Sequence, residues 1–239
     1  MLLEAKNAVI YGGGGSIGAA VARAFAREGA RVHLAGRTLE TLEEVADEIR
    51  SAGGEAETAQ VDALDETAVD EHADAVAASA GSLDISFNLI THPHTHGTPM
   101  AEMGVDDFTA PVVTAVSTTF LTSRAAARHM IRQGSGVILV FGGSGDPMRD
   151  YYLGGTQVAF DAIETIRRQL AVELGPECGS SPSRAQSEAA NAPRPSSVCP
   201  SIIPTIAWRP SNPSGRLGHP SARAMTAAIV NISAGALVD

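Results

Sequence analysis

Short apolar runs alternate with amphipathic segments along the chain as far as Pro176. The apolar runs predict buried β-strands over residues 8–11, 31–35, 83–90 and 136–141, with a further strand ending near 61. Apolar residues at helical spacing between them predict helices over 17–28, 39–51, 66–80, 106–133 and 156–174, the fourth capped by Asp106 or Asp107. Because parallel strands need crossover connections, this alternation predicts an α/β fold with a doubly wound parallel sheet and helices on both faces.

The chain loses this pattern after Pro176. Residues 177–221 are rich in proline and serine, and their prolines exclude long helices and central strands. Read two bases out of frame, the codons for residues 177–182 permit Val-Arg-Val-Val-Thr, which would supply a sixth strand. Two origins of this segment stay open: a frameshift or sequencing error, and a natural disordered insertion. The apolar run 225–238 predicts a return to strand structure.

Composition and charge narrow the function classes. The chain has 239 residues, of which 44% are hydrophobic and 18% charged, and this composition excludes wholesale disorder. A net charge of −10 argues against nucleic acid or an anionic membrane surface as a partner. No apolar run approaches the roughly 20 residues of a membrane span, and the first residues do not form a signal peptide. Two cysteines give no disulfide framework, so we expect a cytoplasmic protein.

The segment 11–18, between the first predicted strand and the first predicted helix, carries the clearest chemical signal. Its glycines let the backbone turn tightly and approach a pyrophosphate at the helix N-terminus, where free N–H groups and the helix dipole favour anions. A glycine turn that binds no ligand is the less favoured alternative in this context. The residues expected to hold a dinucleotide here are Gly12, Gly14, Ser16, Ile17 and Gly18.

The end of the second predicted strand indicates which dinucleotide is bound. A site selective for NAD usually has an acidic residue here to bind the ribose hydroxyls, whereas this chain has Gly36 followed by Arg37. Arg37 and Thr38 can hold a 2′-phosphate, because a guanidinium matches phosphate geometry. The sequence therefore predicts NADP(H) in preference to NAD(H), with an arginine that is merely exposed on a loop as the alternative.

Together these segments resemble the short-chain dehydrogenase/reductase family. The likeness is carried by the glycine segment, by Asp62 after the third strand, by residues 84–88 in the fourth and by 170–176. It implies one Rossmann-type domain over 1–239, with a nucleotide-binding core at 1–176 and a C-terminal strand region at 222–239. It also implies a nicotinamide cofactor, with Asp62 near the adenine and Asn88 and Leu89 beside the cofactor.

The resemblance further implies a small-molecule substrate with a carbonyl or hydroxyl group. It also implies a homodimer or homotetramer built on the two long helices that follow the fourth and fifth strands.

The catalytic set of the family, Asn, Ser and Tyr-x-x-x-Lys, is missing from this chain. The resemblance places Ala115 at the Asn position, Gly143 at the Ser position, Thr156 at the Tyr position and Phe160 at the Lys position. The chain's only lysine is Lys6, on the first predicted strand. Without a lysine beside it, a tyrosine keeps a pKa near ~10 and is a poor general base at neutral pH. The family's standard mechanism is therefore not available.

Substitutes for this set are expected at the carboxyl ends of the fourth and fifth strands, where doubly wound sheets bind their ligands. Ser144 and Tyr152 can hydrogen-bond a carbonyl oxygen, although Tyr152 and its neighbour can also pack with buried rings. On the loop after the fourth strand, His94 and its neighbours His92 and His96 can supply a proton near neutral pH. A histidine run without a role is the alternative, and no metal is expected because no carboxylate or cysteine lies at ligand spacing.

Two functions follow from these expectations. The first is an atypical NADP(H)-dependent oxidoreductase of the short-chain type, whose proton comes from Tyr152, a loop histidine or water. The second is a non-catalytic protein that binds a nicotinamide cofactor or acts as a scaffold. We favour the enzyme, because the fold and the cofactor motif are retained.

Overall fold

The computed structural model describes residues 1–142, 152–174 and 205–207. The predictions for Gly143, Ser144, the codon-derived strand at 177–182 and the run 225–238 lie outside the described residues.

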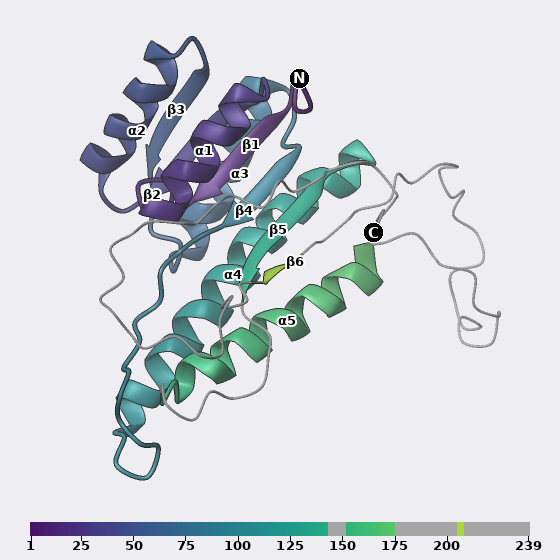
Figure 1. The fold of residues 1–239 in the computed structure, drawn as a ribbon. Coiled ribbons are helices and arrows are strands. Elements are labelled where there is room, and N and C mark those ends of the chain that lie inside the picture. Colours follow the sequence, from purple (N-terminus) through teal and green to yellow (C-terminus); the bar gives the residue numbers. More distant parts are fainter. Residues whose placement is uncertain (143–151, 175–204, 208–239) are drawn as a thin grey trace, which may run out of the picture.

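The strands form one parallel sheet in the order β3-β2-β1-β4-β5-β6 (Figure 1). Its strands are β1 Asn7–Tyr11, β2 Arg31–Gly36, β3 Glu55–Gln60, β4 Ile85–Asn88, β5 Val137–Gly142 and β6 Thr205–Ala207. The chain leaves β1 in one direction to build β2 and β3, then returns to place β4 on the other side of β1. At this reversal the segments after β1 and β4 lead to helices on opposite faces of the sheet, and such a switch point is the usual ligand position in these sheets.

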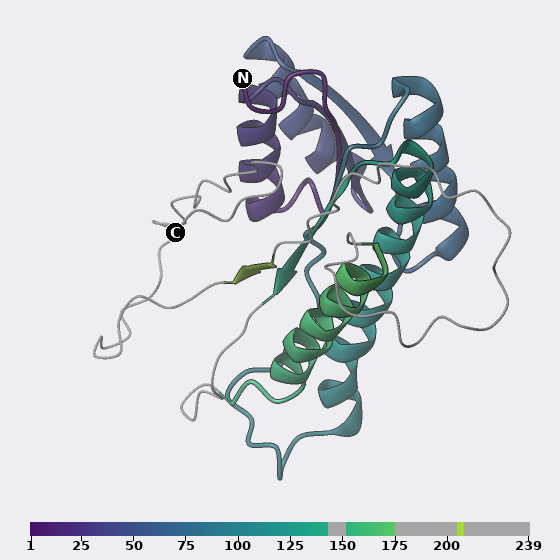
Figure 2. The same ribbon diagram turned by 90° about the vertical axis from the view of Figure 1, so that its right-hand side faces the viewer.

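Helices cover both faces of the sheet, which confirms the predicted doubly wound α/β class (Figure 2). The helices are α1 Ser16–Arg27, α2 Leu39–Ser51, α3 Glu66–Ala80, α4 Val105–Gln133 and α5 Gly155–Leu174. Alternate residues of each strand face opposite helix layers. In β1, Ile10 packs in the cluster that contains α1 and α2, and Val9 packs in the cluster that contains α3, α4 and α5. None of the described helices is long and apolar enough to cross a membrane.

Several predicted boundaries differ from the structure by one or two residues, such as those of the strand predicted over 83–90, which is β4 Ile85–Asn88. Two of the differences concern charged residues. Helix α4 begins at Val105 with Gly104 as its N-cap, so Asp106 and Asp107 lie in the first turn and do not cap it. Carboxylates in a first turn still stabilise a helix, because they face the unpaired N–H groups and the positive end of the dipole. Lys6 precedes β1 instead of lying on it, and its Nζ is 3.1 Å from Asp84 Oδ1.

A short strand lies inside the proline-rich stretch. Strand β6 pairs in parallel with β5, with Val140 opposite Thr205 and Gly142 opposite Ala207. It is the end strand of the described sheet, a position where nearby prolines are tolerated because one edge of the strand needs no partner. The prolines exclude only long helices and central strands here, and a strand of three residues is too short to be predicted from periodicity.

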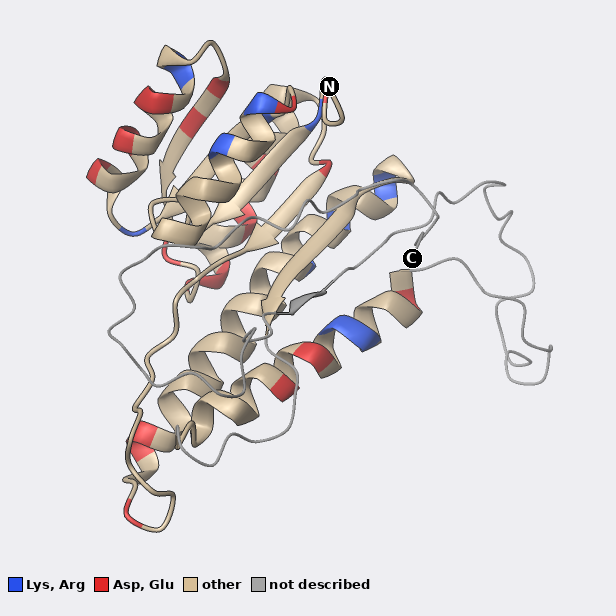
Figure 3. Ribbon diagram, in the orientation of Figure 1, with Lys and Arg blue, Asp and Glu red and all other residues tan. Residues whose placement is uncertain are grey.

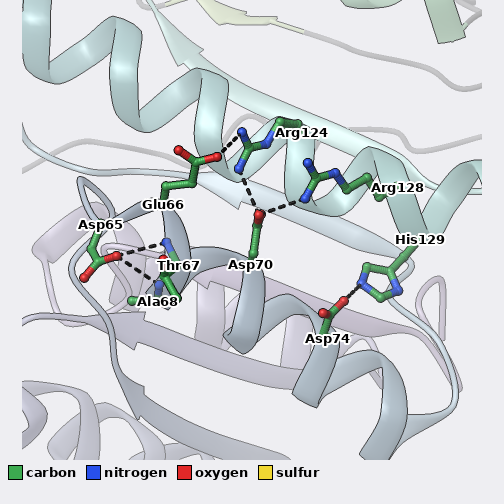
Figure 4. A network of polar contacts seen from close by, with 9 residues as sticks. All are labelled: Asp65, Glu66, Thr67, Ala68, Asp70, Asp74, Arg124, Arg128 and His129. Carbon is green, nitrogen blue, oxygen red and sulfur yellow. Dashed lines mark hydrogen bonds and ion pairs between the residues drawn. The ribbon is translucent and has the colours of Figure 1, made fainter.

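Helices α3 and α4 are joined by a network of charged side chains (Figure 4). Arg124 binds Glu66 at 2.7 Å and Asp70 at 2.9 Å, and Arg128 binds Asp70 at 2.8 Å. Farther along, His129 Nε2 lies 2.7 Å from Asp74 Oδ1. These contacts fix α4, whose N-terminal end follows the loop that leaves β4.

Candidate cofactor and substrate site

The turn after β1 can only be built from glycine at three positions. A Cβ at Gly12 would lie 2.5 Å from the carbonyl oxygen of Leu89, and the φ of Gly12 is +83°. A Cβ at Gly18 would overlap the carbonyl oxygen of Gly12, and one at Gly14 would overlap the Thr41 hydroxyl. The turn therefore brings the backbones of β1, α1 and the end of β4 together and packs against the Thr41 side chain of α2.

The N-terminus of α1 points out of this turn. Among the described residues no side chain caps α1, whose N-cap is Gly15, and its first turn holds no acidic residue. Ser16 is exposed and Ile17 is half-buried. The unpaired N–H groups of this first turn are consequently available to an anion.

Hydrogen bonds hold the backbone of the loop between β2 and α2, whereas the side chains of Arg37 and Thr38 are available to a ligand. Gln60 Nε2 donates to the carbonyl of Arg37 at 2.9 Å, and Thr41 Oγ1 donates to the carbonyl of Thr38 at 3.0 Å. Thr38 is the N-cap of α2, yet its side chain makes no capping bond. Arg37 is exposed and makes none of the ion pairs found in the described part of the chain.

Asp62 follows β3 and Asn88 ends β4. The two side chains make different contacts. Asp62 is exposed after β3, and its carboxylate accepts the N–H of Leu64 at 3.0 Å. Asn88 is buried at the end of β4, where its amide donates to Thr118 Oγ1 at 3.2 Å and accepts from Ile90 N–H at 2.9 Å. The Asn88 side chain thus holds the turn after β4 against α4.

The positions that the resemblance assigned to the catalytic set carry packing residues where the structure describes them. Ala115 and Thr156 are buried, and Phe160 is half-buried against the core. The hydroxyl of Thr156 is buried and has no hydrogen-bond partner among the described residues. Lys6 is held by Asp84 at the amino edge of the sheet, opposite the glycine turn.

Tyr152 lies just before α5 and is exposed over 45% of its surface, with a φ of +47°. The alternative in which its ring is buried is therefore wrong. A positive φ is unusual for a bulky residue, so the backbone around Tyr152 is strained.

The three histidines after β4 have different surroundings. His94 is exposed, its Nδ1 lies 3.3 Å from the carbonyl oxygen of His92, and its ring stacks on that of exposed His96 at 4.5 Å. His92 is half-buried, and its ring meets Phe160 edge to face at 5.6 Å. Burial, and then the nearby His94, lower the pKa of His92 and of His96. The described residues include no group of three His, Cys, Asp or Glu that could hold a metal ion.

The carboxyl edge of the sheet therefore brings together the glycine turn, Arg37, Asp62, Asn88 and the histidine loop. The sequence missed that His92, and not His94, is the histidine that contacts α5. No local signal distinguishes them, because both occur in the same alternating run.

The sequence model of the family described as "short chain dehydrogenase" matches residues 6–146 of the chain. The chain belongs to this family. "Uncharacterized oxidoreductase YxbG" of Bacillus subtilis is 33% identical over 171 residues, which cover 72% of this chain and 62% of that protein. "D-threitol dehydrogenase" of Mycolicibacterium smegmatis is 31% identical, with 57% of this chain and 52% of that protein covered. Against these two relatives, the match spans less than two thirds of their length.

Two solved structures show the same fold. A metagenomic short-chain oxidoreductase in complex with NADP has a TM-score of 0.66 and 29% identity, over 73% of this chain and 78% of that one. An NAD+-bound xylitol dehydrogenase has a TM-score of 0.67 and 26% identity, over 72% of this chain and 67% of that one. Both nicotinamide cofactors thus occur among structures similar to this chain.

Proposed function

We propose that the chain is an NADP(H)-dependent oxidoreductase that interconverts a hydroxyl and a carbonyl group of a small molecule. The observation that carries the proposal is the glycine turn at the N-terminus of α1 with the uncommitted Arg37 and Thr38 beside it. Since similar structures hold either NADP or NAD+, the choice between them rests on this chain's own residues.

The residues present fit a dinucleotide phosphate. The turn leaves no room for a side chain at Gly12, Gly14 and Gly18, so its N–H groups can approach a pyrophosphate. The Arg37 guanidinium and Thr38 hydroxyl would bind the 2′-phosphate, and Asp62 would lie by the adenine. Asn88 would act by holding Leu89 and the following loop in place. When bound, the nicotinamide exchanges a hydride with the substrate.

The substrate oxygen must be bound and protonated without the family's usual residues. Tyr152 is exposed next to α5 and its hydroxyl can donate to a carbonyl oxygen. Ser144 and His94 are the other candidates that the sequence singled out. We further propose a cytoplasmic homodimer or homotetramer, in keeping with the family resemblance.

A second function is favoured by one observation, the packing residues Ala115 and Phe160 where the family has Asn and Lys. On this hypothesis the chain binds the cofactor without turnover, as a sensor or scaffold. The two functions differ in a measurable way, because only the first consumes cofactor.

Cofactor choice is tested by thermal stabilisation. A ligand that binds only the folded state stabilises it by RT ln(1 + [L]/Kd), so NADPH should raise the Tm more than NADH at equal concentration. Arg37→Asp should reverse this order, because it repels a phosphate and can bind ribose hydroxyls. Arg27→Asp, at the opposite end of α1, is the matched control and should keep the preference for NADPH. Equal shifts for both cofactors in the unaltered protein would contradict the assignment.

Turnover is tested by following NADPH absorbance with a panel of small carbonyls, and NADP+ with secondary and sugar alcohols that include xylitol and D-threitol. Oxidation or reduction of any member supports the enzyme. NADPH binding without turnover across the panel selects the non-catalytic function.

A further inference from the structure

The loop that leaves β4 begins at the glycine turn. Leu89 N–H donates to the carbonyl of Tyr11 at 2.8 Å, and the carbonyl of Leu89 abuts Gly12. Three residues of chain span at most about 11 Å, so His92 lies within that distance of the turn. The loop thus starts at the carboxyl ends of β1 and β4, where the strand order reverses.

Of the three histidines, His92 alone is recorded in ring contact with a helix. Its ring and that of Phe160 are 5.6 Å apart, with an interplanar angle of 82°. This edge-to-face geometry is the favoured arrangement for aromatic pairs. Phe160 lies on α5, so the contact ties the loop after β4 to the helix that follows β5. His94 and His96 instead stack on each other in solvent.

The same side of α5 carries an unsatisfied polar group. Thr156 precedes Phe160 by four residues and therefore lies on the same helix face. Its hydroxyl is buried without a hydrogen-bond partner among the described residues, which is unusual because buried polar groups are nearly always paired. The face of α5 that meets the loop thus carries an aromatic ring and, one turn earlier, a buried hydroxyl without a partner among the described residues.

We propose that His92 is the acid–base residue of this site, and that Phe160 positions it. The proposal rests on the oxidoreductase function proposed above. In alcohol oxidation the substrate loses a hydride from carbon to NADP+ and a proton from its hydroxyl to an imidazole nitrogen of His92, and the C=O bond forms. In reduction the imidazolium returns that proton to the carbonyl oxygen. His92 then releases or takes up its proton from solvent.

The surroundings of His92 suit a base. Burial, and second the charge of His94, lower the pKa of His92, so the imidazole is neutral and able to accept a proton at neutral pH. Phe160, which packs on it from α5, carries no charge. On α4, the carboxylate of Asp107 is bonded by Thr95 Oγ1 at 3.4 Å. Among the described residues, His94 is thus the titratable group that bears on this pKa.

His92→Gln tests the catalytic role, and His96→Gln, on the same loop, is the matched control. With NADP+ and the alcohol panel, His92→Gln should lower kcat by about 10²-fold or more and abolish the fall in rate at acid pH. The Tm shift with NADPH should stay unchanged in both variants. His96→Gln should keep the rate and the pH profile of the unaltered protein.

A second readout does not depend on turnover. The imidazole pKa of His92, measured by NMR in the cofactor-free protein and assigned with His92→Gln, should lie below its ordinary value near 6.5. Phe160→Leu should raise it, because the ring that shields the imidazole from water is lost. In this variant the pH at which the rate falls on the acid side should rise together with the pKa of His92.

The outcomes separate the two proposals. Failure of NADPH to bind overturns the proposed function. Turnover that is undiminished in His92→Gln overturns the role of His92 and leaves the oxidoreductase standing. An unchanged pKa in Phe160→Leu overturns the positioning role of Phe160. Cofactor binding with no turnover in the unaltered protein overturns the inference and selects the non-catalytic function.

Discussion

Gly18 lies in the first turn of α1, and the absence of a side chain there lets the turn after β1 close. A Cβ at this position would overlap the carbonyl group of Gly12, whereas one at Gly15 would make only an ordinary contact at 3.4 Å. Gly18→Ala should therefore lower the free energy of unfolding by about 1–3 kcal/mol and remove the Tm shift with NADPH. Gly15→Ala, with a φ of −76°, should retain the shift. Chemical denaturation and thermal shift of both variants measure this, and a normal NADPH response in Gly18→Ala would contradict it.

Which site residues the sequence can predict depends on how local their determinants are. The glycine turn and Arg37 follow from rules within one strand–turn–helix unit, so spacing alone locates them. The contact between His92 and Phe160 joins a loop to a helix far along the chain. The hydrophobic pattern of the sequence cannot predict such a long-range pair. The role of Asn88 was also hidden, because its amide binds Thr118 on α4.

At the scale of elements, the network between α3 and α4 predicts a measurable stability difference. Asp70 accepts from two guanidinium groups, those of Arg124 and Arg128, and is 26% exposed. Asp70→Asn should lower the free energy of unfolding by about 1–3 kcal/mol, because hydrogen bonds to charged groups contribute that much. The exposed pair Arg23–Glu48 provides the control, since Glu48→Gln should cost at most ~1 kcal/mol. Equal losses in urea denaturation would show that the network adds nothing.

The packing of α3 on β2 and β3 predicts acid sensitivity. His33 and His72 line a cavity of about 210 Å³ there, and the buried Nε2 of His33 has no partner among the described residues. Burial, then His33, lower the pKa of His72 from its ordinary 6.5 to about 4. The folded state thus favours neutral His72. The contribution of neutral His72 to the free energy of unfolding is complete above pH ~6.5. It is lost as the pH falls toward ~4, and the loss amounts to up to about 3 kcal/mol.

His72→Leu removes this titration. Its free energy of unfolding should change less between pH 7.5 and pH 5 than that of the unaltered protein. The exposed Met100 gives the control, since Met100→Gln removes no titratable group and should retain the full pH dependence. A pH dependence in His72→Leu equal to that of the unaltered protein would contradict the assignment.

The elements themselves follow largely from the sequence. The strands β1, β2, β4 and β5 and each described helix lie where the apolar period changes, because burial on two sheet faces imposes that period. Strand β3 is the exception, since it carries no apolar run and only its second residue is buried. The ends of the elements are harder to predict. Helix α4 starts at Val105 because Gly104 adopts the extended N-cap conformation. In the sequence, a carboxylate in the first turn of a helix cannot be told from a carboxylate at its N-cap. Strand β6 is defined by its pairing with β5, and three residues are too few to predict a strand from their pattern.

At the scale of the molecule, charge is spread over the surface. Acidic residues lie along α2, at β3 and at the first turn of α4, with basic residues on the helices among them (Figure 3). Some of these charges form ion pairs, such as Arg50 with Glu43 and Asp47. A net charge of −10 distributed in this way favours solubility.

The outer surface of α4 gives the last prediction, which concerns assembly. Val113, Phe120 and Ile131 are exposed there, at 59%, 50% and 66%, and their spacing places them along one side of the helix. Exposed apolar side chains in a row mark an interaction surface, and the family resemblance implies a second copy of the chain as its partner. The unaltered protein should therefore have a mass of two or four chains of 24.6 kDa by light scattering. Val113→Glu should shift it toward one chain, because burying an unpaired carboxylate is costly. Met100→Glu, at an exposed residue of the loop before α4, should leave the mass unchanged, and a monomeric unaltered protein would contradict the prediction outright.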